Sequence, residues 1–170
     1  MIRTWKLVLT AAILLVLSAC STLEEKAAEG MEKAEEVFFG ESVKANEKIE
    51  NVQFFKPSNF SLSEESDAQN IILTNRGEPF VLFINPNEKP DSRLHYDLMK
   101  AKNEDVLFEK TFEEGDRFGF VAVVQNAENV MEVIVSSGGV KMTTLTKEDQ
   151  VEDYIETMMK VVKSVNISKP

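Results

Sequence analysis

Cysteine, histidine and basic residues are scarce in this chain of 170 residues, and each scarcity excludes a kind of chemistry. Cys20 is the single cysteine, so no disulfide can form within the chain. His95 is the single histidine. Because zinc and copper sites draw on clusters of His and Cys, we expect no such metal site.

Basic residues are outnumbered by acidic ones, 19 to 29, which gives a net charge of −10. Residues 1–19 contain Arg3 and Lys6 but no acid, so a chain that starts at Cys20 has a net charge of −12. Nucleic-acid binding requires clustered Lys and Arg, and this composition excludes it. The excess of acid also disfavours flat binding to anionic lipid headgroups and favours a soluble surface.

The N-terminus has the pattern of a secretory signal peptide over residues 1–19. Arg3 and Lys6 precede an apolar run from Leu7 to Leu17, which is shorter than the roughly 20 residues that cross a bilayer as a helix. The residues Leu17-Ser18-Ala19-Cys20 resemble the lipobox of bacterial lipoprotein precursors. This resemblance implies that Cys20 is linked to diacylglycerol and becomes the first residue of the mature chain.

A lipid on Cys20 implies a protein held at the extracytoplasmic face of the cell membrane, because two acyl chains anchor stably where one exchanges. Ser21 follows Cys20 where an Asp would favour retention at the inner membrane. In a host with two membranes, the expected address is therefore the outer membrane.

Residues 20–50 form a separate acidic segment that we interpret as a helical spacer behind the lipidated Cys20. Apolar residues recur there at spacings of three and four, typical of one helix stripe: Leu23, Ala27, Met31, Ala34 and Phe38. Gly40 is expected to end or bend the helix. The alternative is a stripe that docks on the domain or on a partner helix, but alanine buries little area, which favours the spacer.

Residues 51–167 are expected to form one α+β domain, with an antiparallel sheet of about six strands covered by helices. Short apolar runs predict two strands, followed by a short helix with Asp91 or Ser92 as its cap and with Leu94, Leu98 and Met99 on one side. Turn formers then separate four strands of a meander. The predicted strands are Asn70–Thr74, Phe80–Ile84, Val106–Glu113, Arg117–Gln125, Val130–Ser136 and Val140–Thr146.

The strand Phe118–Val124 is apolar on both faces, so it is expected to be covered on each side. Gly119 within it leaves room for an aromatic ring or a neighbouring backbone. A closing helix capped by Thr146, with a wide apolar face from Val151 to Val162, is the expected cover on one face. The helix at 94–99, or the loops around Phe54 and Phe60, would cover the other.

This order of elements, together with Phe55-Lys56-Pro57-Ser58-Asn59-Phe60, resembles the PsbP-like (Mog-type) α/β/α sandwich domains over residues 53–166. Phe60 stands where that family usually has Trp, and Ser164-Val165 stands in place of its closing Ser-Phe. The resemblance implies a non-enzymatic accessory or binding protein. It supplies no catalytic residues.

No motif points to catalysis. His95-Tyr96-Asp97 is a polar trio, but adjacent helix positions point in different directions, and no G-x-S-x-G sequence is present. The turns at 85–91 and Glu113–Asp116 are rich in oxygen ligands without a calcium-loop pattern. Ser136–Gly139 lacks a P-loop pattern and lies between strands, so no cofactor is expected.

These observations leave three hypotheses open. The first is a tethered, non-catalytic module that binds an envelope protein or a small ligand; its candidate interaction surface is Phe54, Phe55 and Phe60. The second is a hydrolase that uses His95 or a pair of carboxylates. The third is a structural lipoprotein that oligomerises through its acidic helix.

Overall fold

The acidic helix does not stand apart from the domain in the computed structural model, which describes residues 21–102 and 105–168. The signal peptide and Cys20 lie outside the described residues. The helices are α2 (Leu23–Phe39), α3 (Leu94–Ala101), the 3₁₀ turn η1 (Glu148–Gln150) and α4 (Val151–Ser164). The strands are β1 (Glu47–Ile49), β2 (Val52–Phe54), β3 (Ser61–Leu62), β4 (Asn70–Asn75), β5 (Glu78–Ile84), β6 (Val106–Glu114), β7 (Arg117–Ala127), β8 (Val130–Ser137), β9 (Val140–Thr146) and β10 (Asn166–Ile167).

The main sheet is antiparallel and has seven strands in the order β3-β4-β5-β9-β8-β7-β6. The predicted α+β class is confirmed, and the meander β6 to β9 has the predicted strands with one or two residues more at some ends. A second sheet, β1-β2-β10, joins the beginning and the end of the domain. The sequence did not indicate this second sheet, because its strands are only two or three residues long.

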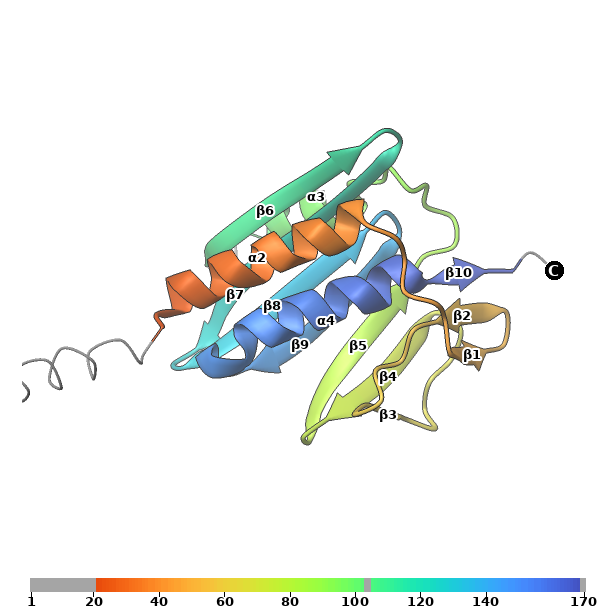
Figure 1. Cartoon of the computed structure of the whole chain (residues 1–170), viewed down its shortest axis with the longest axis horizontal. Helices are drawn as coiled ribbons and strands as arrows, with labels where there is room; N and C mark the ends of the chain where they lie inside the picture. The colour runs from red at the N-terminus through yellow and green to blue at the C-terminus, as the bar shows by residue number, and fades with distance from the viewer. Residues whose placement is uncertain (1–20, 103–104, 169–170) are drawn as a thin grey trace, which may run out of the picture.

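Helices α2 and α4 lie side by side across one face of the main sheet, and α3 lies on the other face (Figure 1). Helices α2 and α4 pack into one large apolar cluster with side chains of the strands, such as Leu73, Phe80, Val123 and Val133. A smaller cluster on the second face contains Met99 of α3 and five strand residues: Phe118, Phe120, Ala122, Val124 and Ile134. The strand at 118–124 is therefore covered on both sides, as its sequence predicts.

Local residues explain the bounds of α2. Thr22 and Glu25 form a capping box, in which Thr22 Oγ1 accepts from the Glu25 N–H at 3.2 Å and Glu25 Oε2 accepts from the Thr22 N–H at 2.9 Å. The helix ends at Gly40, as predicted. The closing helix, in contrast, does not start at Thr146: this residue belongs to β9, and Gln150 precedes α4 without a side-chain cap.

The spacer interpretation of α2 is wrong, because its apolar stripe is buried in the main cluster, with Ala27, Ala34 and Phe38 at 0% exposure. Gly30 lies so close to α4 that a Cβ there would be 3.1 Å from Glu152 Cα. Lys33 bonds the Glu152 carboxylate at 2.5 Å. The alternative, a stripe that docks on the domain, is therefore correct, and residue 50 is not a boundary between independent parts.

Phe38 provides the contact that fixes α2 on the sheet. A Cβ at Gly119 would lie 2.6 Å from Phe38 Cε2, so Gly119 leaves the space that the ring fills, as the sequence suggested. The ring also contacts Phe112, with centroids 5.4 Å apart. The next residue, Phe39, is 43% exposed. The two adjacent phenylalanines thus have opposite environments.

This contrast gives a stability test. We expect Phe38→Ala to lower the free energy of unfolding by about 3–5 kcal/mol, because it empties a fully buried site. The matched variant Phe39→Ala should cost less than about 1 kcal/mol, as a substitution on an exposed side chain usually does. Urea unfolding followed by circular dichroism measures both. Equal, small losses would mean that α2 does not belong to the core.

Candidate functional site

The two faces of the main sheet differ in how well they are covered. Helix α3 packs on β7 and β8, where Tyr96 stacks edge-on against Phe118 and Phe120 with centroids 5.8 and 5.4 Å apart. Over β5 and β9 the same face is open. Val81 is 39% exposed and Leu145 is 46% exposed, although both alternate with buried residues of the main cluster.

A cavity of about 250 Å³ lies at the C-terminal end of α3, where the helix no longer covers this face of the sheet. Its helix side is formed by His95, Leu98 and Met99, and its sheet side by Ile134 and Lys141. Ala101, Lys102 and Glu132 complete the lining. Ile134 and Met99 are buried, at 6% and 4% exposure, whereas Leu98 is 53% exposed at the rim. An apolar base with a few polar groups converging on it is typical of a small-molecule site.

His95 is a fixed, uncharged wall of this cavity. It is buried at 6% exposure, and its Nε2 lies 3.3 Å from the Gly139 carbonyl oxygen, with which an Nε2–H forms a hydrogen bond. Its ring is perpendicular to Phe83, with centroids 5.7 Å apart. Burial lowers the pKa of His95 below its ordinary value, and the nearby Lys141 ammonium lowers it further, although the Gly139 bond and Glu88 act in the opposite direction.

The polar trio around His95 does not form a catalytic arrangement. Asp97 is exposed on the other side of α3, and Tyr96 donates from its hydroxyl to Glu109 Oε1 at 3.4 Å. The hydrogen bond that His95 makes is with a backbone carbonyl rather than with a serine or a carboxylate. Within residues 21–102 and 105–168, no group of three or more His, Cys, Asp or Glu side chains is arranged to hold a metal ion.

The predicted interaction surface of Phe54, Phe55 and Phe60 is not present as expected. Phe54 is fully buried because β2 pairs with β1 and β10 and its side chain enters the main cluster. Phe60 is 4% exposed and packs on Phe80, with centroids 4.8 Å apart. Phe55 is half-buried against the same cluster. Neither Phe54 nor Phe60 can therefore contact a partner at the surface.

The sequence offered two candidates to cover the second face of the sheet: the helix at 94–99 and the loops around Phe54 and Phe60. The loops lie on the face that α4 covers, so the second face is covered by the helix, α3. Within α3 the sequence placed Leu94 and Leu98 on the buried side. The structure instead exposes both and buries His95 with Met99. This rotation exposes Leu98 beside the cavity.

The oxygen-rich turns have structural roles. Glu113, at the β6–β7 turn, bonds Arg93 at 2.6 Å, and Ser136, beside the β8–β9 turn, donates to the Val140 carbonyl at 2.8 Å. Gly138 adopts a positive φ of 54°, and a Cβ there would meet Lys89 O and Pro90 at 2.9 Å. Ser136–Gly139 is thus the hairpin turn that its position between two strands predicts, and the structure adds that this turn packs on the 85–92 loop.

Two further cavities have less suitable linings. One of about 270 Å³ beside the end of α4 includes Lys163, whose ammonium already donates to the Val37 carbonyl at 2.7 Å and to the Gly40 carbonyl. Another of about 190 Å³ near Asn75 is lined almost entirely by polar groups. Tyr154 borders it, and burial, followed by the neighbouring Glu78, raises the pKa of that phenol. The α3 cavity differs from both in combining an apolar base with a half-buried lysine, Lys141, that forms no ion pair within the described residues.

The environment of His95 predicts a pH effect on stability. Because the pKa of His95 is lowered in the folded state, the unfolded chain takes up a proton near pH 6.5 before the folded chain does. Stability should therefore fall as the pH drops below about 6.5, and His95→Gln should remove that part of the fall. Urea unfolding from pH 7.5 to pH 5 checks this. Parallel profiles for the two proteins would contradict it.

Comparison with known proteins gives a distant likeness of fold. No protein-family model matches the chain, and no curated protein matches it in sequence. The structure is similar to the solution structure of cyanobacterial PsbP (CyanoP) from Synechocystis sp. PCC 6803, with a TM-score of 0.45 and 10% sequence identity. The likeness covers 76% of this chain and 96% of that one.

Proposed function

We propose that this chain is a lipid-anchored protein of the bacterial envelope, exposed on the extracytoplasmic side, that acts as a non-catalytic binding or accessory module. The observation that carries the proposal is the lipobox-like Leu17-Ser18-Ala19-Cys20, which is followed almost at once by a folded body. The anchor itself rests on the sequence pattern. The folded body is the part of the protein that such an anchor would hold at the membrane.

The linker between an anchor on Cys20 and the folded body would be very short. Ser21 and Thr22 alone separate Cys20 from the first residue of α2, and Thr22 is already fixed as its N-cap. Three Cα–Cα steps of about 3.8 Å span at most about 11 Å. Since α2 is docked on the core, the lipid would hold the body directly against the bilayer surface.

The direction of α2 suggests which end of the body would lie nearest the bilayer. Helix α2 runs parallel to α4, because Gly30 meets Glu152 and the Val37 carbonyl meets Lys163 (Figure 1). The starts of both helices would therefore face the membrane. The β1-β2-β10 sheet lies at the other end, roughly 25 Å away for a helix of 17 residues.

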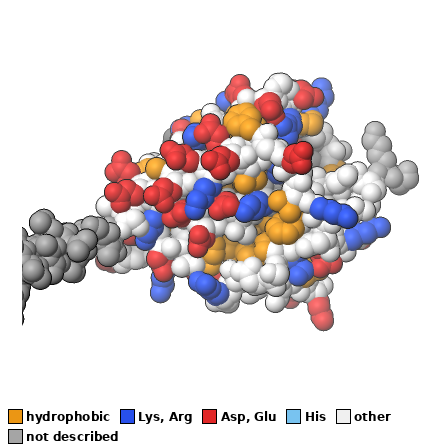
Figure 2. Space-filling view, viewed as in Figure 1, with side chains coloured by type: hydrophobic (Ala, Val, Ile, Leu, Met, Phe, Trp, Pro, Cys, Tyr) orange, Lys and Arg blue, Asp and Glu red, His pale blue; other side chains and the backbone are white. Residues whose placement is uncertain are grey.

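Charge supports attachment by lipid rather than by headgroup contacts. Acidic side chains gather over α2 on the face shown in Figure 2, where Glu24, Glu25, Glu29, Glu32 and Glu36 are exposed. An acidic surface is repelled by anionic lipids. None of the helices within the described residues is long and apolar enough to cross a membrane.

The non-catalytic part of the proposal rests on the state of the reactive side chains. Cys20 would be acylated, and His95 is engaged with the Gly139 carbonyl and held neutral by burial. The hydrolase hypothesis loses support, because no nucleophile bonds to His95 within the described residues. Oligomerisation through α2 also loses support, since its apolar stripe is used inside its own domain.

Intact-mass analysis of protein purified from bacterial membranes tests the anchor. We expect the wild-type chain to begin at Cys20 and to carry acyl groups, because cleavage before the lipidated Cys is what the lipobox resemblance implies. Cys20→Ser should retain residues 1–19 and carry no lipid. Sedimentation with membranes is not a sufficient readout, since an uncleaved precursor sediments too. A wild-type chain with an unmodified Cys20 would refute the proposal.

A further inference from the structure

We propose that the cavity beneath α3 binds a small amphipathic anion, with an apolar body lying over Ile134 and Met99 and a single carboxylate on the Lys141 ammonium. This inference rests on the proposed binding function, but it does not depend on the lipid anchor. It assigns a ligand class to a site that no motif in the sequence marks.

The apolar part of the site follows from the way α3 ends. Helix α3 has eight residues, too few to cover the whole face, so Ile134 and Met99 form an apolar base and Leu98 stands at the rim at 53% exposure. Water in contact with such a base is displaced favourably by apolar groups, at roughly 25 cal/mol for each Å² buried. A volume of about 250 Å³ limits the ligand to a short chain or one ring.

The sign of the ligand charge follows from Lys141. Lys141 lies on β9 within the lining of the cavity, is half-buried, and forms no ion pair within the described part of the chain. Its proximity to His95 is also felt in the lowered pKa of that imidazole. A carboxylate is the natural partner of a half-buried ammonium that has no acidic partner, because a charge-assisted bond is stronger than a neutral one.

The surroundings of Lys141 strengthen this assignment. In a chain with a net charge of −10, the cavity lining contains two lysines, Lys141 and Lys102, and one acid, Glu132. Pairing puts Glu132 opposite Leu145 and Lys141 opposite Ser136, so Glu132 and Lys141 lie at different ends of the cavity with Ile134 between them. An anion at Lys141 is therefore kept away from the acid. His95, neutral and fixed on Gly139, adds no competing charge.

Matched ligands test the proposal on the chain from Ser21 to Pro170. This chain contains every residue that the structure describes in the two apolar clusters, so we expect its core to form without the anchor. The probes are octanoate and phenylacetate, with 1-octanol and octylammonium as head-group controls. Amide shifts in ¹H–¹⁵N spectra give the site and the affinity. We expect a carboxylate probe to shift the amides of α3, β8 and β9, and to bind about tenfold more tightly than 1-octanol.

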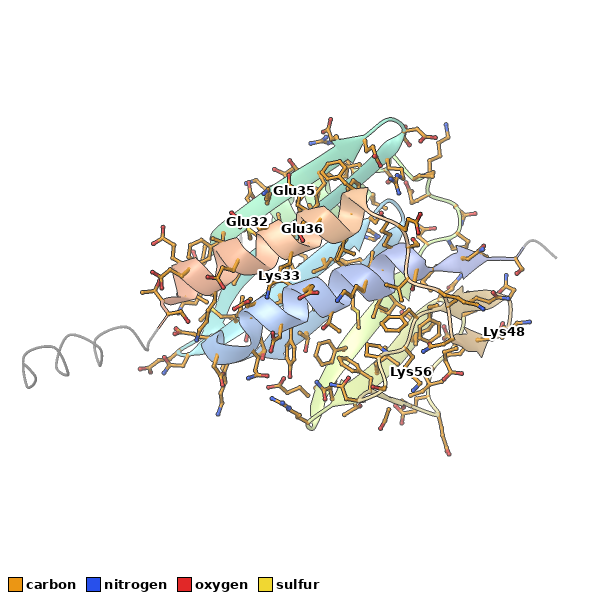
Figure 3. All side chains as sticks on the ribbon, viewed as in Figure 1. Glu32, Lys33, Glu35, Glu36, Lys48 and Lys56 are labelled. Atoms are coloured by element: carbon orange, nitrogen blue, oxygen red, sulfur yellow. The ribbon has the colours of Figure 1, made fainter. Side chains whose placement is uncertain are left out.

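Two variants separate the charge from the apolar base. Lys141→Met should weaken carboxylate binding about tenfold and leave 1-octanol binding unchanged, which a purely structural role of Lys141 would not produce. Lys48→Met is the matched control: Lys48 is an exposed lysine on β1 (Figure 3) and is not part of the cavity lining. Ala101→Trp, at an exposed position in the lining, should fill the cavity and abolish binding of every probe while the protein stays folded by circular dichroism.

Three results would overturn the proposal: no amide shifts from either carboxylate at millimolar concentration, equal binding of 1-octanol and octanoate that Lys141→Met does not change, or shifts confined to amides outside α3, β8 and β9. None of them would bear on lipidation, because the tested chain lacks Cys20. A lipidated protein that fails this test would keep its anchor and lose only this ligand class. Conversely, carboxylate binding would support this site even if the intact-mass test found no lipid on Cys20.

Discussion

The contact between Phe38 and Gly119 determines how the N-terminal segment relates to the rest of the molecule. The ring fills the space above a glycine in β7, and any Cβ at that glycine would overlap it at 2.6 Å. Around this contact Lys33 and Lys163 tie α2 to α4, through a carboxylate at one end and through backbone carbonyls near the C-terminal end of α2. A helix that begins three residues after Cys20 is thus part of the core. An anchor on Cys20 would therefore act on the orientation of the whole body.

The same packing determines where a ligand can bind. Helices α2 and α4 saturate one face of the sheet with a large continuous cluster, whereas α3 covers only part of the other face. The exposed apolar side chains Val81, Leu98 and Leu145 all belong to the partly covered side or its rim. A sheet that is apolar on both faces but covered fully on one leaves its remaining apolar area for a ligand or a partner.

Local patterns predicted most of the fold. Turn formers predicted the four strands of the meander. Helical periodicity predicted the stripe of α2 and the wide apolar face of α4. Gly119 predicted the close approach of an aromatic ring or a backbone, and in the structure it is the ring of Phe38. The features that local patterns did not predict depend on contacts between residues far apart in the sequence. Whether the α2 stripe docks depends on Phe38 meeting Gly119, 81 positions later, and the burial of Phe54 depends on pairing with β10 at the end of the chain. The candidate site depends on the rotation of α3 over Ile134 and Lys141, which its own eight residues do not specify.

Hydrogen exchange of the α2 amides tests most directly whether this helix belongs to the core. A docked helix opens only with the domain, so the amides of residues 27–38 should exchange as slowly as the buried amides of α4, with protection that falls together as denaturant is added. An acidic helix that stands apart from the body would exchange like an isolated helix, within the first time points, while α4 stays protected. That second result would contradict the account, since it would separate the anchor from the fold.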